Sequence, residues 1–199
     1  MLVVVVLTIA LSLCGCGGGK GNIGDSPAGN DSAAEESAAE DIDEDEGNES
    51  TESSFSGTTK ELLQNIIEES NALPEVVIES ITPENAPAML GLLADDFVSF
   101  IEEASAAAGE SDMIAFQAAV ILCKDANDAD MIDGLIQMGF DPGKWVYVFP
   151  DRALTVVSKP YIMLVSGSIK ETESLTESFK KAIGGSSVIS VFYRGETGG

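Results

Sequence analysis

Histidine is absent from this sequence, and its absence excludes several kinds of functional site. Serine–histidine and cysteine–histidine nucleophile pairs, histidine zinc sites and imidazole general bases all require that side chain. Any acid–base chemistry would have to use Asp, Glu, Lys or Tyr. We therefore expect no metal site of the histidine type, and nothing in the sequence indicates a cofactor.

Positive charge is also scarce, with 10 Lys and Arg against 34 Asp and Glu and a formal net charge of −24. Nucleic-acid binding depends on neutralising phosphates with basic side chains, so nucleic acid is excluded as a partner. Docking on an anionic lipid surface, which recruits basic segments, is disfavoured for the same reason.

The longest feature near the start is an apolar run from Leu2 to Leu13, interrupted only by Thr8 and Ser12. A helix of that length rises about 18 Å, well short of the roughly 30 Å hydrocarbon core of a bilayer. The run is therefore too short to span a membrane and is typical of a signal peptide. Because Met1 alone precedes it, where basic residues are usual, we expect the translation start to lie further upstream.

The run ends in Leu13-Cys14-Gly15-Cys16, which resembles the lipobox of bacterial lipoproteins. That motif has an aliphatic residue three positions before the modified cysteine and a small residue directly before it. Cys16 fits, whereas Cys14 would place Leu13 at the cleavage position. We predict a lipoprotein signal peptide at 1–15 and a fatty-acyl (palmitate) anchor on Cys16; an ordinary secretory signal and an apolar N-terminal helix are the alternatives.

Cysteine usage agrees with this prediction. If Cys14 is removed and Cys16 is acylated, Cys123 is the remaining thiol of the mature chain, and an internal disulfide is excluded. Cys123 closes the apolar run 118–122, so we expect it to behave as a small buried hydrophobe.

Residues 16–57 are expected to form a disordered acidic linker. The segment opens with three glycines, and ten carboxylates but no basic residue lie between Glu35 and Glu52. Ile42 and Phe55 are almost its only large apolar side chains, so the segment cannot bury enough surface to offset chain entropy. Residues 58–199 are then long enough for one domain with its own core.

The patterns within residues 58–199 predict a single α+β domain, with a small, mostly antiparallel sheet and flanking helices. Capping boxes at Thr58–Glu61 and Ser168–Glu171 each predict a helix start. The expected helices begin near 58, at Thr82-Pro83, at 128 (ending at Gly139) and at 168. The expected strands are 113–123, 144–149, 153–158, 161–166 and 188–193, while 96–104 fits either a helix or a strand.

The order of these elements and the segment Asp141–Val148 (DPGKWVYV) resemble a family of small lipoproteins of clostridial and related Gram-positive bacteria that carries a domain of unknown function. The resemblance covers about Glu61 to Ile183. It implies a lipobox, an acidic linker, a basic–Trp–aliphatic strand at 144–146 and a C-terminal helix containing Phe179. This sequence departs from the pattern at Gly143 and Pro160. The resemblance implies a location and a fold class but no catalytic residues.

Two acidic groupings resemble chemical sites but do not fit the patterns that such sites require. Asp125–Asp130 does not match a calcium-binding EF-hand loop, which needs glycine at 130 and glutamate at 136, so capping of the following helix by Asn127 or Asp128 explains it better. The pairs Asp95-Asp96 and Glu102-Glu103 are adjacent residues that point in different directions. They do not supply the facing carboxyl groups of a glycosidase.

Aromatic and basic residues between 144 and 152 form the candidate binding surface. On a strand, Trp145, Tyr147 and Phe149 would share one face, either as a platform for sugars or a partner, or as a core face under a helix. Lys144 and Arg152, with Lys159, could receive an anionic group, although pairing with Asp141 and Asp151 is the simpler expectation.

These features predict a non-catalytic lipoprotein of the extracytoplasmic face of the cell membrane, whose domain binds a protein or a cell-wall component. An envelope hydrolase using Asp or Glu chemistry, with Asp151 or Glu171 as example residues, is the alternative. A solute receptor is a third possibility, but receptors of that class usually need two lobes and a longer chain.

Overall fold

The computed structural model describes residues 55–70, 73–111, 113–145 and 147–195. The chain divides into two units, Met1–Glu46 and Gly47–Gly199, and all described residues belong to the second. The predicted signal peptide, the cysteines at 14 and 16 and nearly all of the predicted linker therefore lie outside the described residues. In the part that is described, no helix is long and apolar enough to cross a membrane.

The domain is built on a six-stranded sheet with the order β1-β2-β3-β5-β4-β6, in which every neighbouring pair is antiparallel. This confirms the predicted α+β class and the antiparallel sheet. The strands are β1 (Val76–Ser80), β2 (Ile101–Gly109), β3 (Gln117–Cys123), β4 (Arg152–Ser158), β5 (Tyr161–Gly167) and β6 (Val188–Arg194).

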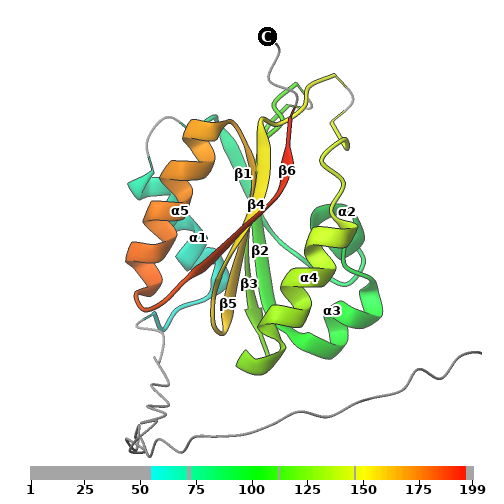
Figure 1. The fold of residues 1–199 in the computed structure, drawn as a ribbon, viewed down its shortest axis with the longest axis vertical. Helices are drawn as coiled ribbons and strands as arrows, with labels where there is room; N and C mark the ends of the chain where they lie inside the picture. Colours follow the sequence, from blue (N-terminus) through cyan, green and yellow to red (C-terminus); the bar gives the residue numbers. More distant parts are fainter. Residues whose placement is uncertain (1–54, 71–72, 112, 146, 196–199) are drawn as a thin grey trace, which may run out of the picture. The chain divides into compact units, whose positions relative to one another are not determined.

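Helices cover both faces of the sheet, so the domain has three layers (Figure 1). One face carries α1 (Thr59–Glu69) and α5 (Ile169–Ile183), which also contact each other. The other face carries α2 (Ala86–Leu90), α3 (Ala94–Phe100) and α4 (Ala129–Gly139), with a short 3-10 turn, η1 (Ala126–Asp128), before α4.

Local sequence signals explain where α1 and α5 begin. The hydroxyls of Thr58 and Ser168 accept hydrogen bonds from the backbone of Glu61 and Glu171, whose carboxylates accept from the cap backbone in return. Both predicted capping boxes are thus confirmed. Gly184, with φ of 73°, ends α5 as predicted, because glycine adopts this left-handed conformation without steric cost.

Two hydrophobic cores result, one on each side of the sheet. The central strands β3, β4 and β5 are buried along nearly their whole length, because helices cover them on both faces. Alternate residues therefore enter opposite cores: Val156 and Met163 join the core under α1 and α5, and Val157 and Ile162 join the core under α2–α4. Cys123 is buried in the second of these, which confirms its expected behaviour as a core residue.

Several predicted boundaries were wrong. The helix expected at Thr82-Pro83 begins only at Ala86, because the Asn85 side chain accepts a hydrogen bond from the Thr82 backbone and holds residues 82–85 in a turn. The strand expected from Met113 begins at Gln117. The ambiguous stretch 96–104 contains both forms, the end of α3 and the start of β2.

The α4 helix ends at Gly139, as predicted, and the structure shows a second reason for glycine at this position. Gly139 is the last residue of α4, and Phe140 is the C-cap. A Cβ added at Gly139 would lie 2.1 Å from the carbonyl oxygen of Gly91. Glycine is therefore required here because α4 packs backbone to backbone against the turn after α2.

Candidate functional site

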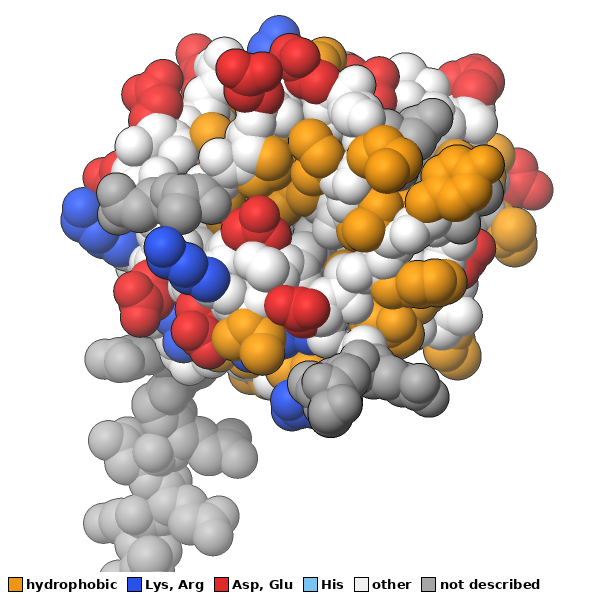
Figure 2. Space-filling view, turned by 90° about the horizontal axis from the view of Figure 1, so that it is seen from above, with side chains coloured by type: hydrophobic (Ala, Val, Ile, Leu, Met, Phe, Trp, Pro, Cys, Tyr) orange, Lys and Arg blue, Asp and Glu red, His pale blue; other side chains and the backbone are white. Residues whose placement is uncertain are grey.

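The candidate binding residues lie at the end of the domain where loop 141–151 joins α4 to β4. Figure 2 looks down on this end and shows hydrophobic side chains gathered along one side of it. Tyr147 and Phe149 are 78% and 64% exposed, which is unusual for large aromatic side chains.

The predicted strand at 144–149 was wrong, since the described residues of this stretch have irregular backbone. None of the described residues of this stretch pairs with a strand of the sheet, whose order places β6 next to β4. The loop begins instead with a turn, in which the Asp141 carboxylate accepts a hydrogen bond from the Gly143 backbone at 2.8 Å. Trp145, Tyr147 and Phe149 therefore do not form a row on one face.

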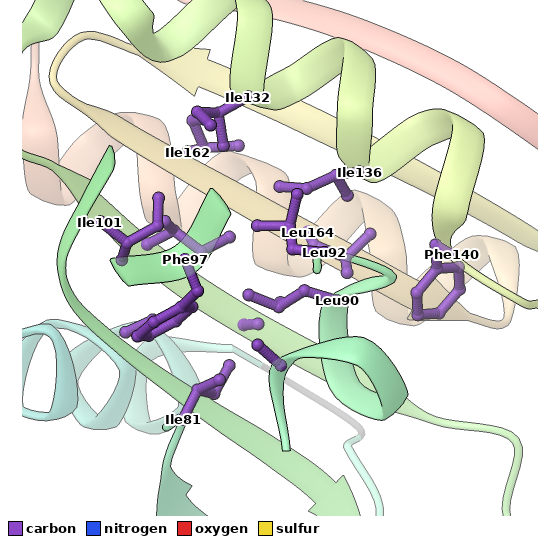
Figure 3. Packing of buried hydrophobic residues seen from close by; sticks show 14 of the residues in the cluster. Ile81, Leu90, Leu92, Phe97, Ile101, Ile132, Ile136, Phe140, Ile162 and Leu164 are labelled. Atoms are coloured by element: carbon purple, nitrogen blue, oxygen red, sulfur yellow. The ribbon is translucent and has the colours of Figure 1, made fainter. Parts of the chain in front are cut away.

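Trp145 packs against the domain and holds the loop in place. Its ring packs edge to face on Phe140, with 6.5 Å between ring centroids, and Phe140 packs similarly on Phe192 of β6 at 6.0 Å. Figure 3 shows Phe140, the C-cap of α4, at one end of the buried cluster under α2–α4, beyond Ile136 of that helix. Trp145 thus belongs to the packing that holds the loop, and Tyr147 and Phe149 extend from a fixed base.

Lys144 is the second fixed point of the loop. Its ammonium group donates hydrogen bonds to the Gln117 side-chain oxygen at the start of β3 and, at 3.2 Å, to the Ala88 carbonyl. It also lies over the rings of Phe140 and Trp145, 4.6 Å and 5.0 Å from their centroids. These contacts tie the loop to α2 and to the sheet, so Lys144 has a structural role and is not free to receive a ligand.

Burial lowers the pKa of Lys144 to about 8, although the negative charge of Asp141 opposes the shift. In the unfolded chain Lys144 keeps its proton up to the ordinary pKa of 10.5, whereas in the folded chain it loses the proton near pH 8. The free energy of unfolding therefore rises between pH 8 and 10.5. We expect this rise to be about 1–3 kcal/mol. We predict that a Lys144→Met variant loses this contribution, as measured by urea unfolding at pH 7.5, 9 and 10.5.

The wild-type curve alone does not isolate Lys144, because burial also raises the pKa of Cys123, to about 12. That shift destabilises the fold as the pH rises above about 9, and both proteins share it. The difference in the free energy of unfolding between wild type and variant therefore isolates the effect of Lys144. A difference that is flat across the three pH values would contradict the assigned burial of a charged lysine.

Arg152 binds the start of α5 and not a neighbouring aspartate. Its guanidinium donates to the Thr172 hydroxyl and, at 3.1 Å, to the Ile169 carbonyl, and it lies 3.4 Å from the Glu173 carboxylate. Lys159 pairs with Asp130 at 2.6 Å. Among the described residues neither Asp141 nor Asp151 forms an ion pair, so the predicted pairing was wrong.

The acidic residues considered for chemistry also have structural partners. The carboxylate of Asp151 accepts a hydrogen bond from the Ile169 backbone at 3.2 Å, and that of Glu171 accepts from Ser168 at 2.7 Å. Asp128 is the N-cap residue of α4, one of the two residues predicted, but its side chain forms no capping hydrogen bond. Asp125 caps the preceding 3-10 turn, since its carboxylate accepts a hydrogen bond from the Asn127 backbone. Within the described ranges, no group of three or more Cys, Asp and Glu residues could hold a metal ion.

A pocket of about 490 Å³ lies beside the exposed ring of Phe149. It is lined by Phe149, Pro150, Asp151, Tyr193, Arg194 and Gly195. The last strand and the end of the loop meet here through a hydrogen bond of 2.7 Å from the Gly195 backbone to the Asp151 carbonyl. The sequence did not indicate Tyr193 or Arg194 as site residues, because only the pairing of β4 with β6 brings them beside Phe149.

Comparison with known proteins adds no further assignment: no family model, curated protein or solved structure matches this chain. The similarity to clostridial lipoproteins therefore stays a prediction.

Proposed function

We propose that this protein is a bacterial lipoprotein, held at the extracytoplasmic face of the cell membrane by lipid on Cys16, whose domain binds a protein or cell-wall component without catalysis. The observation that carries the binding role is the exposure of Tyr147 and Phe149 on a loop with a fixed base. The lipobox-like Leu13–Cys16 supports the location.

The fixed base matters for affinity because ordering a loop on binding costs free energy. Lys144 and Trp145 already hold the loop against α2, β3 and α4, so less ordering remains when a partner binds. Aromatic side chains supply a large contact area with few rotatable bonds, and tyrosine adds a polar hydroxyl. Tyr147 and Phe149 are thus suited to act as anchors.

The pocket adds polar groups beside the aromatic ones. Arg194 can donate hydrogen bonds to carboxylate or hydroxyl groups of a partner, and Tyr193 lies in the same lining. Apolar anchors next to a few polar groups are typical of binding sites for proteins and for sugars. This combination supports a peptide or glycan of the envelope as the bound component.

The test is replacement of both anchors, Tyr147→Ala with Phe149→Ala. Removing two anchor side chains should cost at least about 2 kcal/mol of binding free energy, or roughly 30-fold in affinity. The measurement is crosslinking in intact cells, followed by pull-down and by binding of the purified chain to isolated cell wall.

Val77→Ala is the matched control, because Val77 is 55% exposed on β1, at the edge of the sheet opposite to β6 and the pocket. This variant should bind as wild type does. Absence of any specific partner or wall association for the wild-type chain, or equal loss in both variants, would contradict the proposed role of the loop.

A further inference from the structure

The last strand, β6, forms one edge of the sheet and pairs only with β4. Figure 1 views the sheet along this edge: helices lie on either side of the sheet, and none lies in front of β6. An edge strand presents backbone N–H and C=O groups that a further strand can bind, and proteins usually protect such edges.

The two edges of this sheet differ in charge. At the opposite edge, β1 carries the exposed Glu79 and is preceded by the exposed Glu75, and charged side chains there oppose further pairing. In contrast, residues 182–193 contain no charged side chain, although the chain as a whole carries −24. Arg194 is the first charged residue after this stretch. Arg194 is the last residue of β6, so the edge from Val188 to Tyr193 lacks the charged protection that β1 has.

Exposed apolar side chains lie on both faces of β6. Ile189 and Val191 are 43% and 36% exposed, and they pair with Val156 and Leu154, which point toward α5. Val188 is 63% exposed and pairs with Val157, which points toward α4. The two helix layers thus end before they cover the last strand, and an uncharged strip remains open to solvent.

We propose that β6 pairs antiparallel with β6 of a second copy of this chain, across a two-fold axis, so that one sheet continues through both copies. The distribution of charge favours a second β6 strand over β1 as the partner of β6. Two chains of −24 repel one another, and β6 against β6 is an approach in which uncharged surface meets uncharged surface. Pairing of β6 with β1 of another copy would instead place the carboxylate of Glu79 beside the exposed apolar side chains of β6.

A two-fold arrangement also suits the strand itself. An isologous contact uses the same patch on both copies, so Val188, Ile189 and Val191 of one copy cover those of the other. The added ladder satisfies backbone groups on both strands at once, and the dimer closes without leaving a β6 edge exposed. This inference does not depend on the lipid anchor, and it uses Val188 to Val191, whereas the pocket beside Phe149 takes Tyr193 and Arg194 from the end of the same strand.

Cysteine crosslinking of the purified full-length chain in mild detergent tests the proposal. Single cysteines are placed through the strand, at Val188, Ile189, Ser190 and Val191, and at Ser80 of β1 as the matched control. Residues that face each other across an antiparallel pair lie about 4.5–5.5 Å apart, within reach of a disulfide. At least one β6 variant should form a disulfide dimer under mild oxidation, and the Ser80→Cys variant should not.

A second pair of variants tests whether the exposed apolar side chains of β6 hold the two copies together. Ile189→Lys with Val191→Lys should convert a protein of twice the chain mass into a monomer by sedimentation equilibrium, with an unchanged circular dichroism spectrum. Val77→Lys, at a 55% exposed position of β1, should leave the mass doubled. A monomeric wild type, a mass above that of a dimer, or β6 cysteines that crosslink no faster than Ser80→Cys would overturn the proposal.

Discussion

A Phe179→Ala variant should unfold far more easily than wild type, with a loss of about 3–5 kcal/mol in the free energy of unfolding. Phe179 is 0% exposed and packs between α5 and the sheet, where the rigid neighbours leave a cavity when the ring is removed. Since domains of this size are stable by about 5–15 kcal/mol, much of the total would be lost. The urea midpoint of the full chain, followed by circular dichroism, measures the change.

Glu177→Ala is the control for this prediction, because Glu177 lies exposed on the same helix two residues earlier. Its substitution should change the free energy of unfolding by no more than about 0.5 kcal/mol. If Phe179→Ala were equally mild, the core assigned under α1 and α5 would be incorrect.

Replacing Cys16 with alanine should move the protein from the membrane fraction to the soluble fraction. An acyl chain contributes about 0.8 kcal/mol for each buried CH₂ group, so loss of the anchor removes the main attraction to the bilayer. The apolar run at 2–13 is too short to span the membrane by itself. Fractionation of cells expressing each variant, with immunoblotting of both fractions, measures the effect.

Cys14→Ala provides the matched control, since this cysteine does not fit the lipobox spacing and is removed with the predicted signal peptide. The variant should remain with the membrane. Equal membrane association of the Cys16→Ala protein and wild type would contradict an anchor at that position.

Local signals account for the parts of the fold that the sequence predicted well. Each capping box joins residues three positions apart, and the helices that follow begin where those residues place them. The strands at 152–158 and 161–167 were likewise predicted closely, because β-rich apolar runs are bounded there by turn residues. The α+β class followed from these elements without knowledge of how they pair.

Nonlocal pairing accounts for what the sequence could not predict. The alternation of aromatic residues at 145, 147 and 149 suits a strand, yet contacts of Lys144 with α2 and β3 and of Trp145 with Phe140 hold this stretch as a loop. Lys144 is held by Gln117, 27 residues earlier in the chain, so its role could not be read from nearby aspartates. The open edge at β6 depends likewise on strand order.

The most direct test of the central claim is mass spectrometry of the N-terminal peptide from the mature protein purified from membranes. The expected peptide begins at Cys16 and exceeds the mass of its amino acids by that of attached fatty-acyl lipid. A bare thiol at this residue, or a mature chain that begins elsewhere, would contradict the anchor and the proposed location with it.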